Sequence, residues 1–234
     1  IDVWAVIPDD RTRGHRRFRL GNAKGGYLMP KLDYGNAKVV RANDHVFLQG
    51  QTGMTLEGKE FVGEGDPVAQ VEKAMQNVSE LLEEAGSQMA DICKVTTYVT
   101  DPSTRELIYP VLARHLHGVH PVSTGVVVKA LARPELDFEI DVFAMVPKDR
   151  EKGHERFRGS APNYLPGLDY PLSKAVRAGN FVFLQGQTGL ALAGSGLVGK
   201  GDPAAQAEVA MENVRTLLEE VGARLEDICK VATY

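Results

Sequence analysis

The chain has few cysteines, few aromatic residues and no long apolar run. Two cysteines and one tryptophan occur in 234 residues, and aromatic residues make up 7%. Cys93 and Cys229 are far apart and neither belongs to a CxxC pair, which excludes a disulfide framework and favours a reducing, cytoplasmic compartment. No apolar run approaches the roughly 18–20 residues that span a bilayer, so we expect no membrane partner.

The sequence also lacks a strong excess of charge of either sign. The formal net charge is −4 and the pI is about 5.9. Such a balance provides no general attraction to nucleic acid or to an anionic membrane surface, which makes a nucleic-acid partner a weak hypothesis. The length and the 43% hydrophobic content suit two globular domains of about 100–130 residues each.

An internal repeat dominates the sequence. Residues 33–98 align without a gap to residues 169–234, and 40 of these 66 positions are identical. A shorter repeat relates residues 1–8 to 140–147 and residues 14–19 to 153–158. We therefore expect four parts: a terminal strand and linker at 1–31, a complete unit at 32–147, a linker at 148–168, and an incomplete second unit at 169–234.

Residues 99–139 have no counterpart after the second copy. The sequence begins and ends within segments that resemble strands. We expect either that it is part of a longer gene product or that another chain completes the second unit.

Local patterns predict an α+β unit with helices on one face of a mixed sheet. Strands are expected at 38–42 and 46–51 around a turn at Asn43 and Asp44, and further strands at 93–99, 124–131 and 138–145. Asp66 and Pro67 form a helix start, and apolar residues at helical spacing lead to Gly86. A second helix is expected at 104–116, and the second copy repeats the first helix at 202–222.

Several ordered motifs carry a family resemblance. They are the hairpin end at 47–51, the helix at 69–86, the strand at 91–99, the segment 120–124 and the terminal strand at 138–142. With these motifs the chain resembles the RidA/YjgF-like family, which includes reactive intermediate deaminases and L-PSP-type endoribonucleases. The resemblance implies tandem chorismate-mutase-like domains in trimer-like packing, small-molecule pockets between neighbouring domains, and no cofactor.

The resemblance also implies site residues. Archetypal members hydrolyse enamines and imines, and a glutamate on the last strand handles the attacking water, a role that falls on Glu139 as the catalytic residue. The hairpin glycines correspond to Gly50 and Gly186. The family's carboxylate-binding arginine is replaced by Ser123, which puts the archetypal reaction in question because a hydroxyl cannot act as a charged two-pronged donor.

The remaining candidate substrate-binding residues each have a second interpretation. Gln49 and Gln185 replace the family's hairpin serine and either bind a ligand or bond to backbone at a domain contact. Thr124 either lines the pocket or satisfies nearby backbone groups. Arg133 either supplies the missing positive charge or is an exposed turn residue. Glu139 itself lies on an alternating strand whose polar side could equally face solvent.

Two further groups of residues suggest other sites. His115 and His117 are two positions apart on a helix end and do not face one another, so we expect no metal. The arginines of residues 11–19 could contact RNA phosphates, but a solvated linker or an arm binding a neighbouring subunit is the better interpretation.

Three functions stay open at this point. They are hydrolytic deamination or a related hydrolysis of small reactive metabolites, non-catalytic ligand binding or scaffolding, and RNA binding or cleavage. Because the implied pocket lies between domains, we expect a closed homo-oligomer, most simply a homotrimer.

Overall fold

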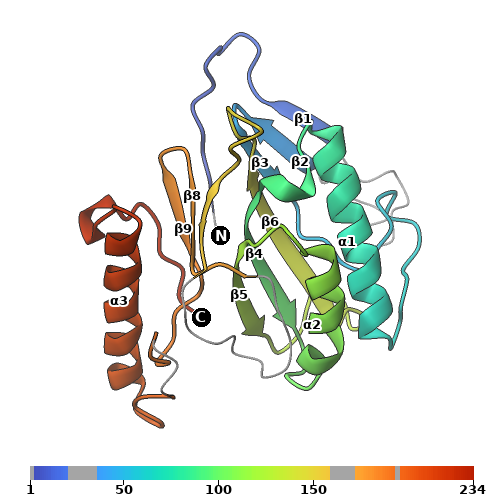
Figure 1. Cartoon of the computed structure of the whole chain (residues 1–234). Helices are drawn as coiled ribbons and strands as arrows, with labels where there is room; N and C mark the ends of the chain where they lie inside the picture. The colour runs from blue at the N-terminus through green and yellow to red at the C-terminus, as the bar shows by residue number, and fades with distance from the viewer. Residues whose placement is uncertain (1–2, 21–35, 159–171, 193–195) are drawn as a thin grey trace.

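The computed structural model describes residues 3–20, 36–158, 172–192 and 196–234 of the chain. The chain has an α+β fold (Figure 1). Its strands are β1 Arg16–Leu20, β2 Ala37–Ala42, β3 His45–Leu48, β4 Ile92–Val99, β5 Val122–Val127, β6 Phe138–Met145, β7 Glu155–Phe157, β8 Ala175–Ala178 and β9 Phe181–Leu184. Its α-helices are α1 Pro67–Glu84, α2 Thr104–His115 and α3 Pro203–Glu220, and short 3-10 helices span Met89–Asp91 and Leu225–Asp227.

The first unit, residues 32–147, supplies five strands, β2 to β6, of a six-stranded mixed sheet. The strand order is β1-β2-β3-β6-β4-β5, in which only β4 and β5 are parallel. Helices α1 and α2 lie side by side on one face of this sheet (Figure 1). Their apolar side chains and those of the sheet form the main core, which includes the fully buried residues Val39, Met75, Leu81, Ile92, Phe138 and Ile140. The expected mixed sheet with helices on one face is confirmed.

Helix α1 illustrates how local sequence sets an element. The Asp66 carboxylate accepts hydrogen bonds from the backbone N–H groups of Val68 and Ala69, at 3.0 and 3.1 Å. Pro67 occupies the first turn, where its missing N–H has no helical partner. The helix ends before Gly86, whose φ of +70° lies in the region that glycine adopts without strain. The helix predicted from these residues is confirmed.

Two strand predictions need correction. The strand expected at 124–131 is β5, which begins and ends earlier because its six residues pair in parallel with β4. The expected linker at 148–168 contains β7, and the corresponding basic segment near the N-terminus contains β1. Both strands form because they pair with hairpin edges, with Arg16 opposite Arg41 and Glu155 opposite Arg177.

The second copy supplies β8, β9 and helix α3, and β7 of the preceding linker completes a three-stranded sheet ordered β7-β8-β9. This small sheet contacts the face of the large sheet that the helices leave open (Figure 1). A second buried cluster joins the two sheets and consists of Cys93, Val122, Met145, Val176, Ala178 and Phe183. Near the N-terminus, the Trp4 ring stacks on Phe143 with centroids 5.7 Å apart. The helix-free face is thus partly covered within the chain.

The two ends of the chain depart from expectation. Neither residues 3–8 nor residues 228–234 form a strand, so the strands predicted there are wrong. Cys93 is fully buried, whereas Cys229 is exposed. Both thiols are free.

None of the helices in the part of the chain that the structure describes has the length and hydropathy of a membrane-spanning helix. Within the same residues, no cluster of three or more His, Cys, Asp or Glu side chains could hold a metal ion.

Candidate functional site

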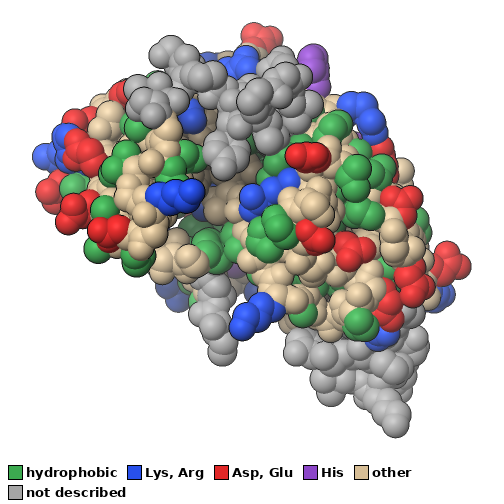
Figure 2. Space-filling view, turned by 90° about the horizontal axis from the view of Figure 1, so that it is seen from below, with side chains coloured by type: hydrophobic (Ala, Val, Ile, Leu, Met, Phe, Trp, Pro, Cys, Tyr) green, Lys and Arg blue, Asp and Glu red, His purple; other side chains and the backbone are tan. Residues whose placement is uncertain are grey.

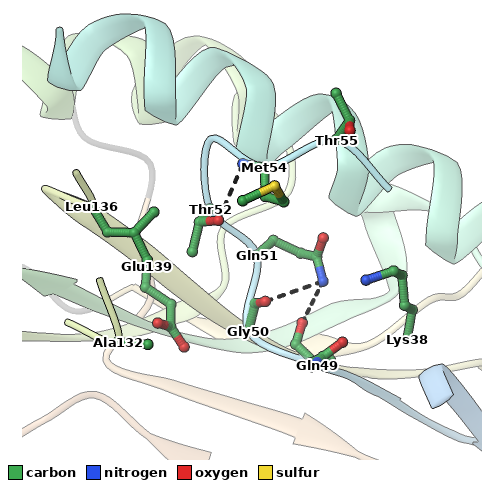
Figure 3. Close-up of a pocket in the computed structure, with 10 residues that line it drawn as sticks. All are labelled: Lys38, Gln49, Gly50, Gln51, Thr52, Met54, Thr55, Ala132, Leu136 and Glu139. Atoms are coloured by element: carbon green, nitrogen blue, oxygen red, sulfur yellow. Dashed lines mark hydrogen bonds between the residues drawn. The ribbon is translucent and has the colours of Figure 1, made fainter. Parts of the chain in front are cut away.

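A cavity of about 170 Å³ lies where strand β3 ends and the chain turns along the edge of β6 (Figure 3). All of its lining residues belong to the first unit, residues 32–147. They are Lys38, Gln49, Gly50, Gln51, Thr52, Met54, Thr55, Ala132, Leu136 and Glu139.

The floor of the cavity is fixed by backbone hydrogen bonds. Gln51 and Ile140 exchange two N–H···O bonds of 2.9 Å, which join the loop after β3 to β6. The buried Gln51 side chain donates to the carbonyl oxygens of Gln49 and Gly50, at 2.6 and 3.3 Å. The Thr52 hydroxyl accepts from the Met54 N–H at 3.2 Å. These bonds hold residues 49–54 in one conformation.

Glu139 enters the cavity because β6 alternates. Phe138 and Ile140 point into the core with no exposed surface, which places Glu139 on the opposite face. A Cβ atom at Gly50 would lie 2.1 Å from a Glu139 carboxylate oxygen. No side chain fits there, so Gly50 allows the carboxylate to lie directly against the backbone.

The surroundings of Glu139 raise its pKa. Burial makes the larger contribution, and the nearby carboxylate of Asp141 adds to it. Asp141 accepts a hydrogen bond of 3.2 Å from the Tyr98 hydroxyl. Burial also raises the pKa of Tyr98, so this hydroxyl remains a donor. A carboxyl group whose pKa is shifted toward neutrality can both accept and return a proton, as general acid–base catalysis requires.

Lys38 was not predicted from the sequence, yet it lines the same cavity. Burial lowers the pKa of its ammonium group. The charge of Arg19 lowers it further, while the Glu57 carboxylate acts in the opposite direction and favours the charged form. The one sequence signal for it is that a lysine recurs at the same position of the second copy, as Lys174.

The other predicted site residues meet elsewhere. The Gly186 N–H donates to the Ser123 carbonyl at 3.2 Å, and a Cβ at Gly186 would lie 2.9 Å from the Thr124 side chain. Gln185, next to Gly186, accepts 2.8 Å from the Gln187 side chain through its carbonyl. The sequence predicted that these four residues share one interdomain pocket with Glu139. None of the four lines the Glu139 cavity. They instead form a contact between β5 and the end of β9.

Arg133 also lies outside the cavity lining, although its neighbour Ala132 belongs to it. Its guanidinium forms an ion pair with Glu135, with Nη2 2.8 Å from Oε1 and Nε 3.2 Å from Oε2. The positive charge proposed for the pocket from the sequence is therefore directed at a neighbouring side chain.

Comparison with known proteins adds an independent observation. The chain is 41% identical over 64 residues to a RutC family protein of Pyrococcus abyssi, a match that covers 27% of the chain and only 50% of that relative. It is 32% identical over 112 residues to Protein DfrA of Myxococcus xanthus, covering 48% of the chain and 84% of the relative.

A solved structure of a YjgF/YER057c/UK114 family member from Mycobacterium tuberculosis is 27% identical. The match covers 56% of this chain and 99% of the Mycobacterium tuberculosis chain, with a TM-score of 0.46.

The sequence profile described as Endoribonuclease L-PSP matches residues 29–146 and again residues 166–234. The two matched segments take up most of the chain and coincide with the two copies of the repeat. The chain therefore belongs to the Endoribonuclease L-PSP family, the RidA/YjgF-like family that its motifs resemble.

Proposed function

We propose that the chain hydrolyses small reactive enamine- or imine-type metabolites in the Glu139 cavity. The observation that carries this proposal is the position of Glu139, which lies half-buried against Gly50 with a raised pKa. In such a reaction water adds to the imine carbon, the C–N bond breaks, and a carbonyl compound and ammonia leave.

Glu139 has the properties that both proton transfers need. As a carboxylate it accepts a proton from the attacking water. As a carboxylic acid it returns that proton to the departing nitrogen. Its raised pKa brings both forms closer to equal population at neutral pH than for an exposed glutamate.

Non-catalytic ligand binding is the second candidate. It is favoured by Ser123, which stands at the position of the family's carboxylate-binding arginine and contacts Gly186 through its carbonyl instead of facing the cavity. A protein that keeps the cavity and lacks that guanidinium would bind a ligand without the archetypal turnover.

RNA binding has the least support. Three of the linker arginines are engaged within the chain: Arg19 pairs with Glu84, Arg150 pairs with Asp91 at 2.8 Å, and Arg156 donates to the backbone carbonyls of Ile92 and His120. On the face shown in Figure 2, basic side chains are interspersed with acidic ones and form no continuous basic track. Affinity for a nucleic-acid backbone comes mainly from basic side chains that neutralise successive phosphates, which requires such a track.

The test is turnover of 2-aminoacrylate and 2-iminobutyrate generated in situ, followed by ammonia and keto-acid release. The wild-type chain should accelerate hydrolysis, and Glu139→Gln should reduce the rate by about a hundredfold or more, since it cannot transfer the proton. Glu64→Gln changes an exposed carboxylate outside the cavity and serves as the matched control. No acceleration by the wild type, with retained ligand binding, would favour the non-catalytic alternative.

We also propose that the chain assembles into a closed homo-oligomer, most simply a trimer. Several apolar side chains of the second copy are exposed in the single chain, among them Met211, Leu225 and Val231. Contacts with other copies would cover such surface. Light scattering should then give a mass of about three times the 25.5 kDa of one chain, and a stable monomer at micromolar concentration would contradict this assembly.

A further inference from the structure

The two linker segments of the chain share a sequence pattern and a local structure. Eight of the twelve residues at 8–19, the first arm, are identical to those at 147–158, the second arm. Each arm then pairs as a strand with the hairpin that follows it, β1 with β2 and β7 with β8. In each arm a histidine ring nitrogen lies 2.7 Å from a carbonyl oxygen nine residues earlier, His15 from Val6 and His154 from Met145. The two arms are therefore equivalent pieces of structure.

The arginines of the second arm hold a turn of the first unit. The Nη1 atom of Arg150 lies 2.8 and 2.9 Å from the two carboxylate oxygens of Asp91. Arg156 donates to the backbone carbonyls of Ala90 and Ile92, at 2.8 and 3.1 Å. Asp91 is the last residue of the 3-10 turn that precedes β4. The second arm thus binds both a carboxylate and adjacent carbonyl oxygens of this turn.

The corresponding arginines of the first arm hold no such turn. Arg11 and Arg17 stand at the positions of Arg150 and Arg156, and both are exposed. Within the described part of the chain Arg11 forms no ion pair, and the Arg17 guanidinium makes only a 3.4 Å hydrogen bond to the carbonyl of His15. A guanidinium binds carboxylate and carbonyl oxygens well, so the first arm presents a basic surface with the geometry of the second arm.

A matching turn is exposed on the second copy. Leu225–Asp227 forms the same 3-10 turn as Met89–Asp91. In both turns a backbone N–H donates to the aspartate carboxylate, at 3.2 Å for Asp91 and 2.9 Å for Asp227. Asp91 is buried, whereas Asp227 is exposed. Among the residues that the structure describes, no basic side chain forms an ion pair with Asp227.

The first arm does not reach this turn within its own chain. Figure 1 shows the tip of the first arm, in blue at the top of the molecule, well apart from the segment that follows α3. The equivalent turn of the first unit is already held by the second arm. An exposed acidic turn and an exposed basic arm therefore remain on each chain, and the contact between Arg150 and Asp91 shows how such surfaces fit together.

We infer that the first arm of one chain binds the Leu225–Asp227 turn of a second copy of the chain. Arg11 pairs with the Asp227 carboxylate, and Arg17 donates to the adjacent carbonyl oxygens. The contact is head-to-tail, because the arm and the turn are different surfaces of the molecule. This inference rests on the self-association proposed above and specifies one of its contacts.

Two complementary variants of the whole chain test the contact. Arg11→Glu alters the arm and Asp227→Arg alters the turn, and both positions are exposed. Each variant alone should associate about tenfold or more weakly than wild type in sedimentation velocity, since like charges then meet. An equimolar mixture should recover the association, because each variant keeps the native half that the other lacks.

Arg16→Glu is the matched control. Arg16 is an exposed arginine of the same arm, and the second arm has Glu155 at this position. The substitution changes the net charge as much as Arg11→Glu does, but it should alter the association constant by less than about twofold. Arg11→Lys keeps the charge and loses the two-pronged donor, so it should give an intermediate affinity.

Three results would overturn the inference. They are wild-type association in both Arg11→Glu and Asp227→Arg, equal weakening by Arg16→Glu and Arg11→Glu, and a mixture that associates no better than its components. Circular dichroism establishes that each variant is folded. A wild-type chain that stays monomeric would contradict both the proposed assembly and this contact, whereas a wild-type oligomer that both variants leave intact would contradict this contact alone.

Discussion

The two copies of the repeat contain the same five-residue segment in two different structures. Residues 91–95 and 227–231 have identical sequences. In the first copy this segment begins β4, where Cys93 and Val95 are fully buried. In the second copy it forms no strand, Cys229 is exposed and Val231 is 64% exposed.

Strand partners account for this difference. β4 lies between β5 and β6 and pairs with both along its length. Within the described residues, no strand pairs with residues 228–234. Strand formation therefore depends on neighbours that are distant in sequence, more than on the intrinsic preferences of the segment.

Helices behave differently. α1 and α3 have the same length, and both begin at an Asp-Pro pair whose carboxylate accepts from two backbone N–H groups. Capping and helical periodicity are local, so both copies satisfy them. Their burial nevertheless differs, because Met75 is fully buried whereas the equivalent Met211 is 48% exposed.

Thiol reactivity should show the largest contrast between the copies. Burial raises the pKa of Cys93 to about 12, whereas Cys229 is exposed. We expect Cys229 to react with a thiol reagent at pH 8 faster than Cys93 by roughly three orders of magnitude, since both access and thiolate fraction favour it. Mass analysis of Cys93→Ser and Cys229→Ser variants identifies each rate. Equal rates would contradict the contrast.

Truncation of the equivalent methionines should give the next largest effect. Met75→Ala should lower the free energy of unfolding by about 2–5 kcal/mol, because it leaves a cavity in the main core. Met211→Ala should cost less than about 1 kcal/mol, because its side chain is half exposed. Urea unfolding measures both, and similar losses would show that α3 is buried in solution.

One equivalent pair should behave alike in both copies. Asn77 donates 2.7 Å to the Met54 carbonyl, and Asn213 donates 2.8 Å to the Leu190 carbonyl. Both side chains are buried. Replacing either asparagine with alanine should cost about 1–3 kcal/mol, since the loop carbonyl is left without its donor. A loss at Asn77 alone would mean that the second copy's loop is not anchored as described.

Glu139 should make a smaller, pH-dependent contribution that the second copy lacks. Its pKa is raised in the folded chain, so the protonated form favours folding and stability is lost as pH rises from the unfolded pKa through the folded one. Glu139→Gln should therefore melt at a higher temperature than wild type at pH 8, and the difference should disappear by pH 4. A variant less stable than wild type at pH 8 would contradict the raised pKa.

The sequence predicted much of this fold because the deciding signals were local. The bounds of β6 match the prediction, and α1 ends within two residues of its predicted end. Both elements could be predicted because the alternation of a strand and the capping of a helix depend on residues that are close in sequence. The limits of β5, the pairing of β1 and β7, and the absence of terminal strands depend on distant partners, which one sequence does not reveal.

The candidate site divides in the same way. Glu139, Gly50 and Gln49 line the cavity and were proposed from the sequence. Lys38 was missed because its position in the cavity arises from packing. Ser123 and Gly186 were also proposed, but they meet at a contact between the copies whose role the sequence could not define.

The central claim is that the ligand binds in the first copy, where Glu139 completes the cavity, and not at the equivalent position of the second copy. Side-chain amide signals of the equivalent glutamines test this directly, since Gln51 and Gln187 make the same hydrogen bond in the two copies. On titration of 2-aminobutyrate into the ¹⁵N-labelled chain, the signals of Gln49 and Gln51 should shift and saturate, while those of Gln185 and Gln187 remain unchanged. Saturating shifts at Gln185 and Gln187, with none at Gln49 and Gln51, would contradict the account.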